Sequence, residues 1–473
     1  MALQFFDTLS RAKREFEPLQ PKKVSLYVCG VTVYDHCHVG HARGAVVFDV
    51  LRRYLQHKGY EVTHVRNITD VDDKIIDRAR SESSGDLTAA AAAVARRYEQ
   101  SFREDFSKLD LLPPTQEPKA TEFIPKMIQF VGKLVQAGYA YEGADGVYFS
   151  VRKLNTYGQL SHQRPDQMMA GVRIDPGEGK REPLDFALWK KAKPEEPSWP
   201  SPWGEGRPGW HIECSTMSTD ILGDTFDIHG GGQDLIFPHH ENERAQALGA
   251  GKKFANYWLH NGLLTVNGQK MSKSVGNIIS IQDVLKKHSA DVLRMFFLSA
   301  HYKSPQDFTW ERLEEAASGY ETIRAFLAHA GLFGKKSGAD SSACAEAETK
   351  FHAAMEDDLN TPKALAALHD LRSEATHGKI DPVEAAAMLW RLVQILGFFQ
   401  SISLAGGISS GESVGVPALI GGASEEVKKL LAERDKARKR KDFATSDKIR
   451  KQLTEMGYIV EDTSGQTVVR KKA

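Results

Sequence analysis

Short apolar runs alternate with longer amphipathic stretches in the first part of the chain. Residues 24–29 form a β-branched and aromatic run that ends at Gly30, which predicts a buried strand. Apolar residues recur at helical spacing through residues 40–58, and a second strand-like run covers residues 61–68. Strand, helix and strand with short connections make a βαβ unit, so we expect a parallel sheet and an α/β fold class.

Beyond this unit the pattern changes character. Residues 113–209 are rich in Gly, Pro and Trp and carry one helical stretch near residues 124–136, so we interpret this segment as an insertion into the first domain. An α/β pattern returns at residues 210–260. Helical periodicity runs through almost all of residues 311–400, which predicts a helix bundle.

The C-terminal part predicts a linker and a small module. Residues 401–422 contain six Gly and five Ser, a composition typical of a flexible linker. Helical stretches follow at residues 424–439 and 443–455, and alternating residues from Tyr458 to Val469 predict a hairpin that turns at Ser464-Gly465.

Length and composition are those of an ordinary cytoplasmic enzyme or binding protein. The 473 residues suggest about three domains at ~150 residues each, and 41% hydrophobic and 26% charged residues are typical of globular proteins. The N-terminus reaches Asp7 before a signal-peptide stretch could form, and no window approaches the ~20 apolar residues of a membrane span. Four widely spaced cysteines make no disulfide framework, which favours a reducing compartment.

The charge is balanced overall but uneven along the chain. Lys and Arg number 62, as do Asp and Glu, yet residues 425–473 hold 14 basic against 9 acidic residues. This surplus suggests a basic terminal module on a mildly acidic body, although a solvated basic helix explains it equally well.

Two short motifs are candidates for binding phosphate. His38-Val39-Gly40-His41 opens the first predicted helix, where unpaired amides and two imidazoles would face an anion and Gly40 permits close approach. Lys270-Met271-Ser272-Lys273-Ser274 predicts a mobile cationic loop suited to polyphosphate. Taken alone, surface or capping histidines and a solvated loop are the commoner explanations. No P-loop occurs, and the Gly-x-Gly-x-x-Gly at residues 204–209 follows prolines and contains Pro208, so we interpret it as a loop.

A further set of residues has the chemistry of a metal site. His239 and Glu243 are four residues apart and would face the same way on a helix that begins after Pro238. Cys214 lies 25 residues before His239, and Cys29 ends the first strand. Two cysteines, a histidine and a glutamate suit zinc, but on spacing alone two buried structural cysteines are the better explanation.

Three consecutive glycines, Gly230, Gly231 and Gly232, follow a predicted strand. They would let the backbone lie against a flat ligand such as a nucleoside, or they form a flexible turn.

The motifs together resemble the class I aminoacyl-tRNA synthetases, and four longer strings are similar to the cysteinyl-tRNA synthetase family. The strings are Tyr27-Val28-Cys29-Gly30, Asn67-Ile68-Thr69-Asp70-Val71-Asp72-Asp73-Lys74, Gly209-Trp210-His211-Ile212-Glu213-Cys214 and Phe237-Pro238-His239-His240-Glu241-Asn242-Glu243. The resemblance implies a Rossmann-like parallel-sheet catalytic domain with an insertion, followed by an α-helical bundle and a small C-terminal α+β module. The implied divisions are catalytic domain 1–112 and 210–260, insertion 113–209, KMSKS-loop and stem-contact region 261–310, tRNA-binding bundle 311–400, linker 401–422 and basic anticodon-binding module 423–473.

The resemblance also implies the roles of particular residues. It gives one zinc ion held by Cys29, Cys214, His239 and Glu243, catalytic roles to His38, His41, Lys270 and Lys273, and an ATP site, with Mg²⁺, at His38, Gly40, His41, Gly230, Gly231, Gly232 and Lys273. It places Gly30, Thr69, Trp210, His229 and Asp234 around the substrate cysteine.

The implied activity is ATP-dependent formation of cysteinyl-adenylate and transfer of cysteine to tRNA(Cys), with zinc selecting the substrate thiol and the chain acting as a monomer. The cysteine ligase of mycothiol biosynthesis resembles the same catalytic half but lacks the basic terminal module. A non-catalytic zinc- or tRNA-binding paralogue would be expected to lack part of the set His38, His41, Lys270 and Lys273, which is complete here.

Overall fold

A computed structural model describes most of the chain. The described residues are 2–164, 179–272, 275–330, 342–400, 418–420, 427, 429–430, 433–434, 436–437, 440, 442–456, 458–463 and 466–471. The chain divides into two compact units, Met1–Tyr320 with Ala347–Leu368 and Glu321–Glu346 with His369–Ala473. Within the described ranges, none of the helices combines the length and apolarity that a membrane crossing requires.

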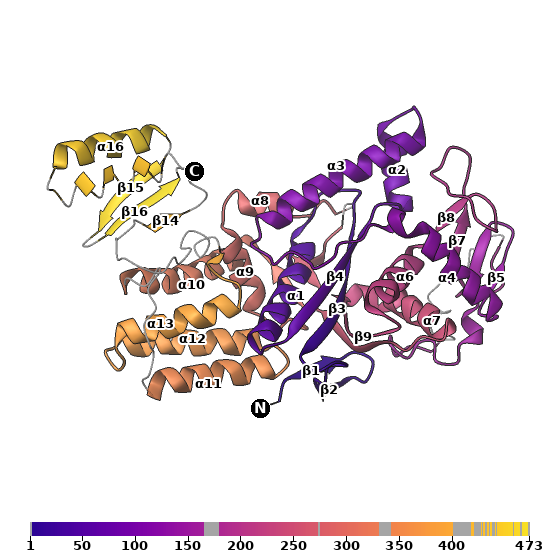
Figure 1. The fold of residues 1–473 in the computed structure, drawn as a ribbon, viewed down its shortest axis with the longest axis horizontal. Coiled ribbons are helices and arrows are strands. Elements are labelled where there is room, and N and C mark those ends of the chain that lie inside the picture. Colours follow the sequence, from indigo (N-terminus) through magenta and orange to yellow (C-terminus); the bar gives the residue numbers. More distant parts are fainter. Residues whose placement is uncertain are drawn as a thin grey trace. The chain divides into compact units, whose positions relative to one another are not determined.

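The first unit is built on a parallel sheet of four strands in the order β10-β9-β3-β4. The strands are β3 (Lys23–Thr32), β4 (Glu61–Thr69), β9 (Thr225–Gly232) and β10 (Phe254–Asn261). Helix α1 (Val39–His57) connects β3 to β4, which confirms the predicted βαβ unit. Figure 1 shows α1 on one side of these strands and α6 (Trp210–Leu222) and α7 (Glu241–Gly249) on the other, an α/β arrangement.

The apolar runs of the strands explain why the sheet forms, because the strands are buried between two layers of helices. Strand β3 buries Val24, Leu26 and Tyr27, and β4 buries Val62 and Val65. A cluster under the carboxyl ends of the strands joins Tyr27 and Val65 to aromatic and sulfur side chains of α6, β9 and β10, namely Met217, Phe226, Phe254 and Trp258. This packed layer supports the residues that follow it in each strand.

The insertion has more regular structure than its composition predicts. Helix α4 (Ile124–Gln136) lies where it was expected, but it packs on an antiparallel sheet of four short strands. These strands are β5 (Ala140–Glu142), β6 (Gly146–Phe149), β7 (Phe186–Lys191) and β8 (Gly206–Pro208). The interpretation of residues 204–209 as a loop was therefore wrong for Gly206–Pro208. A Cβ on Gly206 would lie 2.3 Å from the Lys190 carbonyl oxygen, so the neighbouring strand requires a glycine there.

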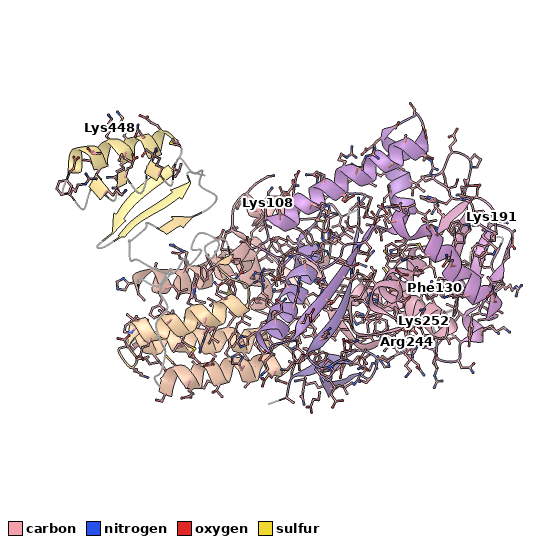
Figure 2. The ribbon with its side chains drawn as sticks, in the orientation of Figure 1. Lys108, Phe130, Lys191, Arg244, Lys252 and Lys448 are labelled. Carbon is pink, nitrogen blue, oxygen red and sulfur yellow. The ribbon has the colours of Figure 1, made fainter. Side chains whose placement is uncertain are left out.

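Smaller elements complete the first unit. They are the hairpin β1 (Gln4–Asp7) and β2 (Ala12–Glu15), helices α2 (Asp73–Glu82) and α3 (Leu87–Ser107), the sheet of β11 (Leu264–Val266), β12 (Gln269–Lys270) and β13 (Gln306–Phe308), and helices α8 (Ile281–Leu285) and α9 (Ala290–Leu298). Lys252, just after α7, lies 5.9 Å from the ring of Phe130 in α4, so the insertion contacts the helical layer of the main sheet (Figure 2).

The helical structure predicted for residues 311–400 is present as α10 (Trp310–His329), α11 (Ser342–Glu356), α12 (Thr361–Thr376) and α13 (Pro382–Ile395). The terminal module contains α16 (Phe443–Glu455) and the predicted hairpin, β15 (Tyr458–Thr463) with β16 (Gln466–Lys471). Its turn at Ser464-Gly465 lies outside the described residues. Within residues 401–422 the described part, β14 (Ala418–Ile420), pairs with β16.

A buried histidine makes the fold sensitive to acid. His64 in β4 is 6% exposed, and neither ring nitrogen has a hydrogen-bond partner among the described residues. Burial, aided by the charges of Arg66 and Arg52, lowers the pKa of His64 to about 3. An unfolded histidine takes up its proton near pH 6.5, so the unfolded state binds more protons below that value and stability falls as the pH falls toward 3.

Replacing His64 with leucine should therefore raise the thermal unfolding midpoint, and the gain should grow as the pH falls from 7 to 5. The leucine removes two unpaired nitrogens and a pH-dependent cost of about 1.4 kcal/mol per pH unit. Thermal melts at several pH values measure this, with His329→Leu as the exposed control. Equal shifts at pH 7 and pH 5 would contradict the buried neutral state of His64.

Candidate active site

The candidate site lies at the carboxyl ends of the parallel strands. The chain moves from β3 to β4 in one direction across the sheet and from β9 to β10 in the other, so the direction of winding reverses between β3 and β9. Open α/β sheets bind ligands at such a reversal, outside the carboxyl ends of the strands. Cys29, Thr69, His229 and His260 occupy these ends in β3, β4, β9 and β10 respectively.

A register shift between Val28 and Val31 contains Cys29, near the carboxyl end of β3. Irregularities of this kind re-aim side chains next to functional sites. Gly30 lies in the shift, and its amide donates to Asn67 Oδ1 at 2.8 Å. A Cβ on Gly30 would lie 1.6 Å from the Asn67 carbonyl oxygen, so this close approach of β3 to β4 requires glycine.

The four residues that the resemblance implies as zinc ligands lie together. The ligand atoms of Cys29, Cys214, His239 and Glu243 are all within 4.8 Å of one another. The two sulfurs are 3.7 Å apart, and Cys29 Sγ is 3.5 Å from Glu243 Oε1. Metal bonds of about 2.3 Å to sulfur and about 2.0 Å to oxygen or nitrogen give tetrahedral edges of about 3.8 and 3.5 Å, so both distances fit zinc.

Three further elements bring the other three residues to Cys29 of β3. Cys214 lies in the first turns of α6, and Glu243 lies in the first turn of α7. His239 belongs to a π-helical turn, Ile236–His240, that leads into α7 and contains the non-helical Phe237. The non-helical residue precedes Pro238, so the helix expected after Pro238 is confirmed, and His239 Nε2 lies 2.9 Å from Glu243 Oε1, four residues further along it.

Burial and mutual charge set the protonation of the four ligands. Burial opposes ionisation of Glu243, but the charges of His239 and His229 outweigh it and lower the pKa of Glu243 well below its usual value. The pKa of His239 rises to about 10, because the charge of Glu243 overcomes burial. Against burial, a hydrogen bond from Cys29 lowers the pKa of Cys214 to about 6, while burial raises that of Cys29 well above its usual value. The cluster therefore has the anionic groups that a metal cation needs, and metal binding would displace protons from His239 and Cys29.

Further imidazoles, which the sequence left unassigned or missed, surround the four ligands. His211 Nδ1 lies 2.9 Å from His239 Nδ1, His240 Nε2 lies 3.3 Å from Cys29 Sγ, and His240 Nδ1 lies 2.8 Å from His260 Nε2. His211 and His240 lie within the sequence motifs that contain the implied ligands, so their proximity to the site could be expected. His260 belongs to β10 and is part of no such motif, so no sequence pattern indicated its position.

The structure brings some of the five residues implied around the substrate cysteine into contact with the cluster. Thr69 is buried, and its hydroxyl donates to Glu213 Oε2 at 2.9 Å. Trp210 begins α6 and stacks on the His239 ring at 4.1 Å, while His229 Nε2 lies 2.8 Å from Glu243 Oε2. Asp234 lies in the exposed turn Gln233–Leu235. Trp210 and His229 therefore contact cluster residues directly, and Gly30 follows Cys29 in β3.

The histidine motif caps α1 differently from the expectation. His38 Nδ1 accepts from the Gly40 amide at 3.1 Å, His41 Nδ1 accepts from the His38 amide at 3.2 Å, and the two rings stack at 3.8 Å. The Val39 amide donates to the Ile279 carbonyl at 3.0 Å. The sequence predicted unpaired amides here that could bind phosphate. This prediction was wrong for His38, Val39 and Gly40, because their amides already donate hydrogen bonds to acceptors within the protein.

The imidazoles themselves supply the donors. Burial lowers the pKa of His38, and burial with the charge of His38 lowers that of His41 to about 3, so both rings are neutral at pH 7. Since each Nδ1 accepts a hydrogen bond, each Nε2 carries the proton and can donate to an anion.

The lysine motif lies against the histidine motif. Lys270 ends β12, and the Met271 side chain approaches Gly40, where a Cβ would lie 2.9 Å from Met271 Cε. The Ile281 amide donates to the Cys37 carbonyl at 3.1 Å, so the segment after the motif pairs with the loop before α1. Lys273 and Ser274 lie outside the described residues.

The three glycines form the end of β9, so the alternative prediction of a flexible turn was wrong. A Cβ on Gly230 would lie 2.3 Å from the Phe48 ring, and one on Gly231 would lie 2.8 Å from the His240 ring. Close packing under the site requires glycine at both positions.

Comparisons with known proteins agree with this architecture. Residues 15–318 match the family model of the tRNA synthetases class I (C) catalytic domain, residues 350–400 match the DALR domain and residues 421–470 match the cysteinyl-tRNA ligase anticodon binding domain. A solved structure of Mycobacterium tuberculosis methionyl-tRNA synthetase in complex with methionyl-adenylate is similar in fold, with a TM-score of 0.59, 15% identity, and 79% of this chain and 89% of that chain covered.

Curated relatives match along the whole length. The Cysteine--tRNA ligase of Geobacter metallireducens is 46% identical over 494 residues, and that of Coxiella burnetii RSA 493 is 47% identical over 476 residues, with 100% of each chain covered in both cases. The chain therefore belongs to the cysteine--tRNA ligase family of the class I aminoacyl-tRNA synthetases and is an enzyme of the ligase class.

Proposed function

We propose that this chain activates cysteine with ATP and transfers it to tRNA(Cys), and that a zinc ion at the floor of the pocket selects the substrate thiol. The observation that carries the proposal is the four-residue cluster of Cys29, Cys214, His239 and Glu243, in which the Cys29–Cys214 and Cys29–Glu243 distances have the dimensions of tetrahedral edges. It lies at the same sheet edge as the paired histidine and lysine motifs. A zinc ion there supplies a Lewis acid that favours a thiolate ligand over a hydroxyl.

In the first step the substrate carboxylate attacks the α-phosphorus of ATP, a P–O bond forms, and pyrophosphate leaves with the electron pair of the broken bond. The carboxylate is already an anion, so this step needs positioning and charge stabilisation rather than a base. The Nε2–H groups of His38 and His41 donate to phosphate oxygens, and Lys270 and Lys273 with the magnesium of ATP balance the growing charge. In the second step the oxygen of a terminal tRNA hydroxyl attacks the activated carbonyl and forms an ester bond, the bond from that carbonyl to the adenylate oxygen breaks, and AMP leaves with the electron pair while the hydroxyl proton is released.

Charging of unfractionated tRNA with labelled cysteine tests the whole proposal, run with and without prior removal of zinc by a chelator. We expect charging that chelation abolishes and added zinc restores. Cysteine activation without transfer to tRNA would favour an amino-sugar ligase instead. A full rate after complete zinc removal would contradict the metal's role.

The lysine motif gives a second expected result. Lys273→Ala should lower the rate of cysteinyl-adenylate formation by about 10²–10³-fold, the effect of removing one preorganised charge-stabilising donor, and should change cysteine affinity little. Single-turnover adenylate formation measures the rate, and the exposed Lys133→Ala in α4 is the matched control. An unchanged rate would exclude Lys273 from the step.

A further inference from the structure

Two histidines beside the implied zinc ligands make up a second group of four possible metal ligands together with two of those ligands. The ligand atoms of Cys29, His229, His240 and Glu243 also lie within 4.8 Å of one another. This set shares Cys29 and Glu243 with the first set and replaces Cys214 and His239 by two imidazoles. Both imidazoles are fully buried. We propose that these four residues are a second, weaker binding set for the same divalent cation, which rests on the proposed role of the first set as the zinc site.

The shared glutamate faces both sets at once. Its Oε1 lies 2.9 Å from His239 Nε2, and its Oε2 lies 2.8 Å from His229 Nε2. A carboxylate can bind a metal through either oxygen, so Glu243 can serve both positions without a change of rotamer. The other shared ligand, Cys29 Sγ, is 3.7 Å from Cys214 Sγ on one side and 3.3 Å from His240 Nε2 on the other. The second distance is close to the edge of about 3.5 Å that a tetrahedral site has between sulfur and nitrogen.

The second set has the supporting contacts of a metal site. Metal-binding histidines are oriented by a hydrogen bond on the other ring nitrogen. His240 Nδ1 lies 2.8 Å from His260 Nε2, and His260 Nδ1 lies 2.7 Å from Thr8 Oγ1, so a chain of three residues aims His240 Nε2 at the site. His239 has the corresponding support from His211. The His229 ring is held by stacking on Trp258 at 4.7 Å and 12°.

Two features make the second set the weaker one. His229 Nδ1 is buried and has no hydrogen-bond partner among the described residues. If Nε2 of His229 binds a metal, the proton moves to Nδ1, where an unpaired N–H is costly. The second set also has one thiolate rather than two, so it favours zinc and cobalt less strongly than a site with both cysteines.

Matched double variants separate the two sets. Cys214→Ala/His239→Asn removes the ligands that belong to the first set alone, and His229→Asn/His240→Asn removes those that belong to the second set alone. Affinity for Zn²⁺ and Co²⁺ is measured by chelator competition, and the numbers of sulfur and imidazole ligands are measured by X-ray absorption. Thermal melts of every variant show that the chain is folded.

We expect Cys214→Ala/His239→Asn to bind one equivalent at least tenfold more weakly than the unmodified chain, through one sulfur and two imidazoles. Adding His240→Asn, or His229→Asn where the former does not fold, should weaken binding at least tenfold more. His229→Asn/His240→Asn should retain one equivalent with two sulfurs and one imidazole.

Two results would overturn the proposal. In one, the folded Cys214→Ala/His239→Asn chain binds no metal; in the other, its binding does not respond to loss of His229 or His240. Failure of the first set is distinguishable, because the unmodified chain would then lack two sulfur ligands or would bind zinc no more tightly than Cys214→Ala/His239→Asn.

Discussion

Replacing Gly30 with alanine should abolish cysteine-dependent ATP–pyrophosphate exchange and lower the thermal unfolding midpoint. The new Cβ would lie 1.6 Å from the Asn67 carbonyl oxygen and 2.8 Å from its carbonyl carbon. Both are backbone atoms, so no side chain can rotate away and the ends of β3 and β4 must separate. Overpacking of this kind costs about 1–3 kcal/mol or more.

The separation would reach the site directly. The Gly30 amide donates to Asn67 Oδ1, and Asn67 Nδ2 donates to Thr69 Oγ1 at 3.2 Å, so one side chain connects the carboxyl ends of both strands. Cys29 precedes Gly30 in the same register shift. A displacement of about 1 Å at reacting groups can cost about 10²-fold in rate, and here a proposed metal ligand, Cys29, and a proposed substrate-pocket residue, Thr69, would move together.

Gly132→Ala is the matched control for this substitution. Gly132 lies in α4, and nothing is within 4 Å of an added Cβ. Alanine is the better helix former by about 0.5–1 kcal/mol, so this variant should be as active as the unmodified chain and slightly more stable. A Gly30→Ala chain with exchange activity within a few-fold of Gly132→Ala would show that β3 and β4 can part without moving the pocket.

The central sheet was predictable because its information is local. The apolar runs of β3 and β4 and the helical spacing of α1 each lie within a single element. Their residues are buried in the core, so each element has a hydrophobic pattern that can be recognised from its own sequence. The sheet of the insertion was missed because its strands are three to six residues long and because β6 pairs with β7, which lies far along the sequence. Gly206 and Pro208 are untypical of a strand, so β8 was not recognised from the sequence. The close packing of β8 on β7 explains why residue 206 is a glycine.

The candidate site was predictable in its parts more than in its assembly. His239 and Glu243 are close in sequence, so their pairing could be expected from spacing alone. Cys29 and Cys214 are 185 residues apart and meet only because β3 and α6 pack together, which no local pattern encodes. The start of α1 could not be predicted for the same reason. The Val39 amide donates a hydrogen bond to the carbonyl of Ile279, which is 240 residues away in sequence.

Cys214→Ser should lower zinc affinity and cysteine affinity together and should reduce the preference for cysteine over serine. The two amino acids differ by one atom, and a pocket that discriminates by size alone gains only about 1–3 kcal/mol, or about 10–200-fold. Zinc adds a bond that a thiolate makes well and a hydroxyl makes poorly. Loss of one of the two cysteine sulfurs, 3.7 Å apart at the floor of the site, removes part of that bond's support.

The measurement is the ratio of kcat/KM for cysteine and serine in ATP–pyrophosphate exchange, at a buffered free zinc concentration that saturates the unmodified chain. The ratio for Cys214→Ser should fall toward the 10–200-fold range that size permits. Cys344→Ala is the matched control, because it removes a buried thiol of α11 and leaves all four cluster residues in place. If Cys214→Ser kept both its zinc and the full preference for cysteine, the metal would be structural and the selectivity would have to come from other side chains, such as the proposed pocket residues Trp210 and Thr69.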